Sequence, residues 1–157
     1  MLKYVDTQVT FAEVPNEIAL CINISNCPCN CEGCHSHHLA LDTGNPLDWG
    51  SLNALIHINH GITCVAFMGG DADPAAVSKL AEKVKRLDLK TCWYSGRPTI
   101  SEAINIDNFD FIKVGPYMPS KGPLTSRTTN QRFYAVVHED ETKLKDITPF
   151  FWKEQFK

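Results

Sequence analysis

The feature of this sequence that most constrains its fold is a series of continuous apolar segments that end at glycine or polar residues. Three of them are residues 17–25 (EIALCINIS), 62–70 (ITCVAFMGG) and 90–96 (KTCWYSG). They have the length of β-strands and lack the polar alternation of a half-exposed strand, so they predict strands buried on both faces. Residues 109–115 (FDFIKVG) and 132–137 (RFYAVV) predict two further strands.

Helical segments separate these predicted strands. Residues 47–61 predict a helix that Asp48 caps, and residues 73–89 predict a second helix with Asp73 as its N-cap. A short helix is expected near residues 99–104. Alternating buried strands and helices predict an α/β fold with a mostly parallel sheet covered by helices, in a single domain over residues 1–157.

Three polar or glycine-rich motifs follow the predicted strands. A cysteine cluster follows the first strand, GGDAD (69–73) ends the next, and YSG (94–96) ends the third. In parallel sheets, ligands gather at the carboxyl ends of the strands. The sequence therefore predicts that the three motifs meet at one edge of the sheet.

Charge and composition narrow the function classes. The formal net charge of −3 argues against a general nucleic-acid binder. The N-terminal residues lack the apolar core of a signal peptide, and no apolar run approaches membrane-spanning length. We therefore expect a cytoplasmic protein that binds neither nucleic acid nor membrane. In a reducing compartment, clustered cysteines indicate metal or redox chemistry, whereas the isolated Cys21, Cys64 and Cys92 are expected to be small buried hydrophobes.

The segment 26–38 reads NCPCNCEGCHSHH and offers two kinds of metal site. Four cysteines, or three with His35, could hold zinc, although zinc sites usually draw ligand pairs from two separate places. Alternatively Cys27, Cys31 and Cys34, spaced C-x3-C-x2-C, could hold three corners of a [4Fe–4S] cluster and leave the fourth iron open to substrate. Cys29 is then a surplus thiol, and His35, His37 and His38 are expected to be solvated loop residues.

The motifs together resemble a known family. C-x3-C-x2-C after the first strand, with a GG-acid motif after the next, resembles the radical S-adenosylmethionine superfamily. Within it, CPCNCEGCH, YSG and GPYMPSKGPLTSRTTNQRF (115–133) are similar to the activating proteins of anaerobic ribonucleoside-triphosphate reductase. The resemblance covers residues 18–137, and Asn130-Gln131-Arg132 identifies the subfamily.

The resemblance implies a shortened, open (partial) α/β barrel of the radical S-adenosylmethionine type. It implies a [4Fe–4S] cluster and S-adenosylmethionine as cofactors. The implied activity is reductive cleavage of S-adenosylmethionine, after which the 5′-deoxyadenosyl radical abstracts a hydrogen atom from a glycine of the reductase. The implied partners are the reductase large subunit and a flavodoxin- or ferredoxin-type electron donor. The alternatives are a small-molecule enzyme of the same superfamily, such as one that makes a deazapurine precursor, and a zinc-stabilised binding module.

The resemblance also implies site residues. Cys27, Cys31 and Cys34 would ligate the cluster. The residues expected to border S-adenosylmethionine are Gly69, Gly70, Asp71, Tyr94 and Ser95. Asp71 stands where the superfamily usually has glutamate, and its side chain is one methylene shorter. The segment 113–132, which carries four basic and no acidic residues, is expected to help admit the reductase.

Overall fold

The computed structural model describes residues 2–28 and 41–152. Its strands and helices are, in chain order, β1 (Lys3–Thr10), β2 (Ala19–Ile24), β3 (Asn45–Pro46), α1 (Trp49–Ile58), β4 (Cys64–Met68), α2 (Pro74–Lys85), β5 (Lys90–Tyr94), η2 (Ile106–Asn108), β6 (Phe111–Val114), β7 (Arg132–His138), β8 (Thr142–Asp146) and η3 (Thr148–Trp152), of which η2 and η3 are 3-10 helices.

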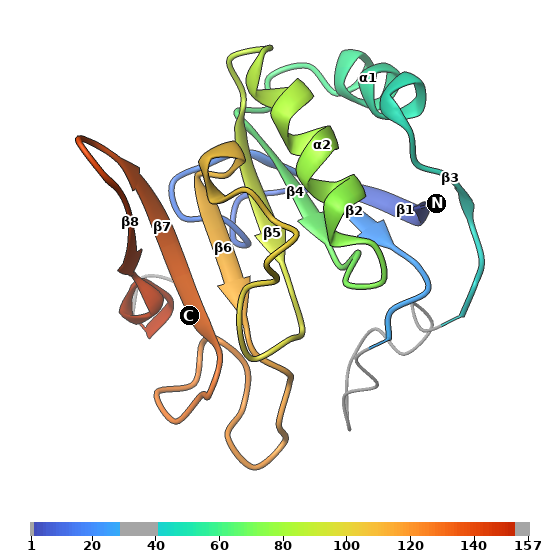
Figure 1. Cartoon of the computed structure of the whole chain (residues 1–157). Coiled ribbons are helices and arrows are strands. Elements are labelled where there is room, and N and C mark those ends of the chain that lie inside the picture. Colours follow the sequence, from blue (N-terminus) through green and yellow to red (C-terminus); the bar gives the residue numbers. More distant parts are fainter. Residues whose placement is uncertain (1, 29–40, 153–157) are drawn as a thin grey trace.

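All described strands form one open sheet in the order β3-β1-β2-β4-β5-β6-β7-β8. The central strands β2, β4, β5 and β6 are parallel. Both margins are antiparallel: β1 pairs with β2 and β3 on one side, and β7 pairs with β6 and β8 on the other. The fold is therefore a mixed, sheet-dominated α/β structure (Figure 1).

The expected partial α/β barrel with a helix-covered, mostly parallel sheet is wrong. A barrel needs each strand to return through a helix to the next parallel strand, and this alternation stops after β5. The connection from β5 to β6 contains only the three-residue η2, and β6 returns through residues 115–131 to the antiparallel β7. The described residues contain only two α-helices, of 10 and 12 residues. The antiparallel hairpins end the sheet at both margins instead of closing it.

The two α-helices lie on the same face of the sheet (Figure 1). They lie in the connections from β2 to β4 and from β4 to β5, and right-handed crossovers that step in one direction place their helices on one side. As predicted, Asp48 caps α1 and Asp73 caps α2. The core under the helices is apolar, and its members include Ile22, Phe67, Val77, Val84 and Trp93.

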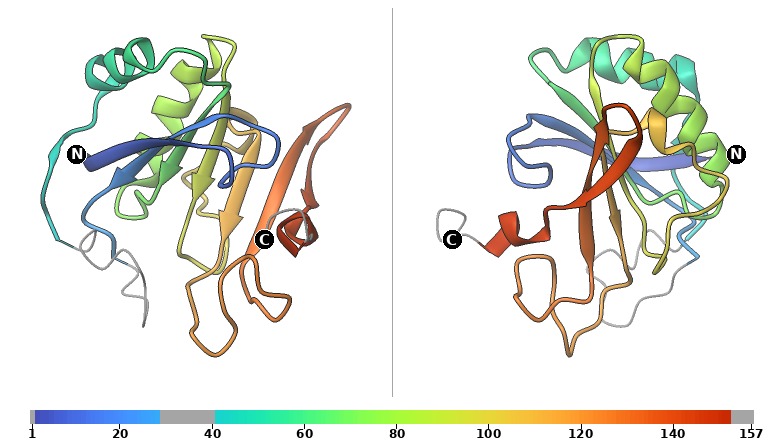
Figure 2. Two further views of the ribbon diagram at one scale, coloured as in Figure 1. Left: turned by 180° about the vertical axis from the view of Figure 1, so that it is seen from behind. Right: turned by 60° about the vertical axis from the view of Figure 1, so that its left-hand side comes forward.

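The opposite face, which we call the open face, is covered by irregular segments. The loop between β1 and β2 folds over it and buries Val14 completely, and η3 packs on it near the β7–β8 hairpin (Figure 2). The strand residues beneath the loop are small: Ala19, Cys21, Cys64, Ala66 and Cys92. Small side chains let the loop approach the sheet closely, so the loop covers this part of the sheet in place of a helix.

The strands that form from continuous apolar segments were predicted correctly. The more polar strands and the short helix after β5 were not. The predicted strands at residues 17–25, 62–70, 90–96, 109–115 and 132–137 correspond to β2, β4, β5, β6 and β7. The helix expected near residues 99–104 is absent from the described residues, and the turn of 3-10 helix comes two residues later. The strands β1, β3 and β8 were not predicted.

Candidate functional site

The parallel strands end at a common edge of the sheet, which we call the rim. The last residues of β2, β4, β5 and β6 are Ile24, Met68, Tyr94 and Val114. Their carboxyl ends point to the lower edge in Figure 1, and the loop 115–131 extends from the same edge. The predicted convergence of strand-end motifs on one edge is therefore found for every motif residue that the structure describes.

Cys27 lies three residues beyond β2 and its side chain is half-buried. The chain leaves β2 through Ser25, whose hydroxyl donates a hydrogen bond of 2.5 Å to the carbonyl of Thr43. Asn26 has a left-handed φ of 60°, and its N–H donates to the carbonyl of Leu41 at 2.9 Å. The two ends of the cysteine segment are thus held together at the rim. Cys29, Cys31, Cys34 and the three histidines lie outside the described residues.

Gly69 and Gly70 turn the chain away from β4, and both have positive φ angles, +108° and +93°. A Cβ atom on Gly69 would lie 3.2 Å from the carbonyl oxygen of Ile24, and one on Gly70 would lie 2.6 Å from Cγ2 of Val77. The glycines therefore allow close packing of the chain against β2 and α2. Both carbonyls are engaged: Trp93 Nε1 donates to Gly69 at 2.7 Å, and the N–H of Asp73 donates to Gly70 at 3.0 Å.

Asp71 and Ser95 meet directly across the rim. The Ser95 hydroxyl donates to Oδ1 of Asp71 at 2.5 Å, and the N–H of Gly96 donates to Oδ2 at 2.9 Å. Both side chains are buried, at 8% and 0% exposed. Ser95 Oγ also accepts a hydrogen bond from the N–H of Arg97. This arrangement joins the end of β4 to the end of β5 and fixes the plane of the carboxylate.

Lys113 extends the connection to β6. Its side chain is 8% exposed, and its ammonium donates to the carbonyls of Ser95 at 3.2 Å and Gly115 at 2.8 Å. The N–H of Gly115 donates in turn to the carbonyl of Arg97 at 2.7 Å. A buried cation and a buried carboxylate thus lie on either side of Ser95. The rim therefore combines fixed backbone turns with one buried acidic and one buried basic side chain.

A pocket of about 380 Å³ opens on the open face beside these strand ends. Tyr94 is one of its walls, and its hydroxyl donates to the carbonyl of Glu13 at 2.5 Å. Burial raises the pKa of Tyr94 well above its usual value, so the phenol stays protonated. The pocket is lined by Ala12, Glu13, Tyr94, Lys113, Tyr117, Pro123, Leu124, Thr125, Gln131 and Phe151.

The predicted site residues fall into two groups. Asp71 and Ser95 meet at the rim, and Gly69 is joined to the same strand end because its N–H donates to the carbonyl of Tyr94. Tyr94 itself faces the pocket, whose lining includes neither the glycines nor Asp71. Within residues 2–28 and 41–152, no group of three or more histidine, cysteine, aspartate or glutamate side chains is placed to hold a metal ion. Because two of the three predicted ligands lie outside those ranges, the metal site stays a prediction.

The three isolated cysteines are buried, as expected. Cys21 is 2% exposed, and Cys64 and Cys92 are completely buried. Burial raises the pKa of Cys21 to about 11 and raises the pKa values of the other two thiols further. These thiols therefore stay protonated at neutral pH, and a thiol that keeps its proton is a poor metal ligand.

Several residues of the pocket and the rim were not predicted. Lys113 falls in the segment 113–132, which the sequence predicts to help admit the reductase, but as the charged residue of the apolar strand FIKV it also carries a signal for a buried role. Glu13 and Phe151 reach the pocket from positions far away in the sequence. No local pattern distinguishes them.

Comparisons with protein-family models, with curated proteins and with solved structures gave no match. No described helix is both long and apolar enough to cross a membrane.

Proposed function

We propose that this chain is a radical S-adenosylmethionine activating enzyme that generates a glycyl radical on an anaerobic ribonucleoside-triphosphate reductase. The observation that carries the proposal is the position of Cys27, the first cysteine of C-x3-C-x2-C, at the strand edge where Gly69, Asp71 and Ser95 meet. The proposal needs the cysteine segment and the co-substrate site at one edge, and it does not depend on a barrel.

The residues at the rim fit the proposed groups. Cys27 is half-buried, so its sulfur is not enclosed in the core as the isolated cysteines are. Thiolates are suitable ligands for iron–sulfur clusters. Asp71 accepts hydrogen bonds from Ser95 and Gly96, and these contacts orient its carboxylate at the rim. A carboxylate held in this way is a suitable group to lie beside the ammonium of the methionine moiety.

A bound [4Fe–4S] cluster would supply the electron that cleaves S-adenosylmethionine. Cys27, Cys31 and Cys34 would hold it. The chain's own contribution is to position and shield the co-substrate. Lys113 and Asp71 hold the strand ends together, and the pocket provides an aromatic and apolar surface beside them. A volume of about 380 Å³ is within the usual range for small-ligand sites, roughly 300–1,000 Å³.

The pocket also supports a second candidate, a small-molecule enzyme of the same superfamily. A pocket walled by Tyr94, Tyr117 and Phe151 could hold a small aromatic substrate as well as a nucleoside. In that case the protein would cleave S-adenosylmethionine and transform a small molecule without any reductase.

The test uses the anaerobically reconstituted full chain with S-adenosylmethionine, a strong reductant and the anaerobic reductase. We expect methionine and 5′-deoxyadenosine to form, together with a glycyl-radical EPR signal on the reductase. Cys27→Ser should remove both products and signal, whereas Cys29→Ser should retain them. Cleavage without any glycyl radical would favour the small-molecule enzyme. No iron and no cleavage in the reconstituted protein would contradict both candidates.

A further inference from the structure

The C-terminal 3-10 helix η3 forms one wall of the pocket on the open face. Phe151 lines the pocket directly, and its ring lies edge-on to Phe133 with ring centroids 5.0 Å apart. Phe133 is fully buried and also contacts Tyr94, on another wall, with centroids 5.9 Å apart. Through Phe151, η3 therefore packs into the aromatic cluster that also contains Tyr94 of the pocket wall.

The start of η3 is fixed to β7. Thr148 is completely buried, and its hydroxyl oxygen accepts a hydrogen bond of 2.8 Å from the N–H of Phe133. The N–H of Ile147 donates to the carbonyl of Phe133 at 2.9 Å, and Asp146 accepts from both the N–H and the hydroxyl of Thr148. The segment is thus a fixed support, which can hold a neighbouring loop in place.

Trp152, the last residue of η3, contacts the loop 115–131. Its Nε1–H donates to the carbonyl of Leu124 at 2.9 Å, and the guanidinium of Arg127 lies over its ring at 5.8 Å from the centroid. Trp152 and Arg127 do not line the pocket, whereas Pro123, Leu124 and Thr125 do. The tryptophan therefore contacts the loop without lining the pocket itself.

Internal hydrogen bonds connect the turns of the loop 115–131 to one another. The N–H groups of Lys121 and Gly122 both donate to the carbonyl of Met118, and the N–H of Ser126 donates to that of Pro123. The hydroxyl of Thr128 donates to the carbonyl of Lys121 at 2.7 Å, which joins the two turns. Holding the loop at Leu124 and Arg127 therefore also holds the wall that faces the pocket.

We propose that Trp152 is a positioning residue for the co-substrate pocket: it holds the loop 115–131 closed against the pocket, so that ligand affinity depends on a side chain that the ligand does not touch. The identity of the ligand as S-adenosylmethionine rests on the proposed function. The loss of one hydrogen bond and one cation–π contact should weaken binding by about tenfold. Trp152→Phe, which keeps a ring under Arg127 and removes only the N–H donor, should have a smaller effect.

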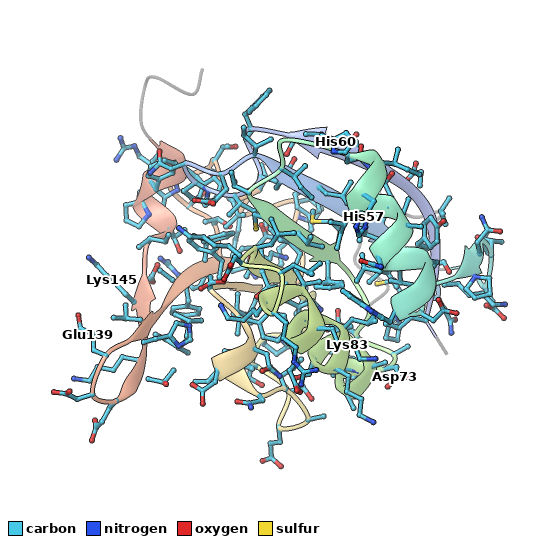
Figure 3. The ribbon with its side chains drawn as sticks, turned by 90° about the horizontal axis from the view of Figure 1, so that it is seen from above. His57, His60, Asp73, Lys83, Glu139 and Lys145 are labelled. Atoms are coloured by element: carbon cyan, nitrogen blue, oxygen red, sulfur yellow. The ribbon has the colours of Figure 1, made fainter. Side chains whose placement is uncertain are left out.

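The test measures two quantities on the full chain. Hydrogen exchange reports opening of residues 115–131, and titration of the reconstituted protein with S-adenosylmethionine gives the dissociation constant. Trp49→Ala is the matched control, because Trp49 also has a cation over its ring, Lys83 at 5.9 Å, but lies on the helical face. Figure 3 shows Lys83 on α2, well away from Lys145 on β8, the strand that directly precedes η3.

We expect Trp152→Ala to speed exchange in residues 115–131 and to raise the dissociation constant, with Trp152→Phe intermediate and Trp49→Ala like wild type in both. Unchanged exchange in Trp152→Ala overturns the proposal, and so does faster exchange with unchanged affinity. If wild-type protein does not bind S-adenosylmethionine at all, the proposed function and the role in co-substrate binding both fail. In that event the exchange data alone still decide whether Trp152 holds the loop, so the two failures are distinguishable.

Discussion

The two faces of the sheet are covered in different ways. On the helical face, α1 and α2 lie on a continuous apolar core, and the contacts come from regular elements with capped ends. On the open face, a loop, a 3-10 helix and the 115–131 segment cover small and aromatic side chains and leave a pocket between them. Residues of the same strands therefore face two environments.

This difference assigns separate tasks to the two faces. Regular helices cover the apolar core and stabilise the sheet. The pocket on their face, about 510 Å³ between α1 and α2, is lined mainly by residues of these helices and of the segment before α1, and its lining includes none of the strand-end motifs. Irregular segments bring residues from distant parts of the chain, such as Glu13 and Phe151, to one place. We expect substitutions on the helical face to change mainly stability, and those around the pocket to change ligand binding as well.

The largest effect should come from a side chain at Gly70. In Gly70→Val the new Cβ would lie 2.6 Å from Cγ2 of Val77, and the φ of +93° disfavours any branched residue. Overpacking and backbone strain together should lower the free energy of unfolding by about 2–5 kcal/mol. Urea denaturation measures this loss.

Gly61→Ala is the control for backbone strain alone. Its φ is +85°, but nothing lies within 4 Å of the added Cβ, so the cost should be only about 1–2 kcal/mol. If Gly70→Val were no more destabilising than Gly61→Ala, the close packing of the rim against α2 would be wrong.

Alkaline pH should lower the free energy of unfolding, because the buried thiols of the open face keep their protons in the folded chain. Burial raises the pKa of Cys21 from its ordinary value of 9.0 to about 11. Between these values the unfolded chain releases the proton and the folded chain keeps it, so stability falls as pH rises. The contribution of Cys21 between pH 9 and 11 should be about 2 kcal/mol, measured by urea denaturation at each pH.

Comparing slopes separates this effect from the cost of a cavity. Cys21→Ala should lose some stability at every pH, yet its stability should fall less steeply between pH 9 and 11 than that of wild type. Equal slopes in the two proteins would show that the Cys21 thiol does not resist ionisation in the folded state.

A pair of phenylalanines tests the difference between the faces at a smaller scale. Phe67 and Phe133 are both completely buried, one under the helices and one beneath the pocket. Leucine at either position should cost about 1–2 kcal/mol. Only Phe133→Leu should also weaken binding of S-adenosylmethionine, because Phe133 supports Tyr94 and Phe151. Equal binding in the two variants would contradict the division of tasks.

Strands and helices with a strong pattern in their own residues were predicted, whereas those that depend on pairing with distant residues were not. The strand β4 is a continuous apolar run, and α2 has an N-cap, an early proline and an apolar stripe, so both were predicted. In contrast, β8 (TKLKD) is mostly exposed, and its strand conformation depends on pairing with β7. The antiparallel margins that rule out a barrel depend on such pairings, which have no strong local pattern.

The candidate site divides in the same way. The sequence placed Gly69, Asp71 and Ser95 at strand ends, which was sufficient to predict that they meet. It did not predict that Lys113 would turn its ammonium to two backbone carbonyls, since those acceptors belong to a turn and a strand end brought together only by folding. The meeting of Asp71 and Ser95 was predictable because both follow strand ends, whereas the acceptors of Lys113 carry no such sequence signal.

The proposed function depends above all on whether Cys27, together with Cys31 and Cys34, holds a [4Fe–4S] cluster at the rim. The decisive measurement is iron and sulfide content with low-temperature EPR of the reduced protein after anaerobic reconstitution, in wild type, Cys27→Ser and Cys29→Ser. We expect about four irons and a cluster signal in wild type and Cys29→Ser, and their loss in Cys27→Ser. Stoichiometric zinc without iron in wild type, or a cluster that survives in Cys27→Ser, would show that this site does not exist.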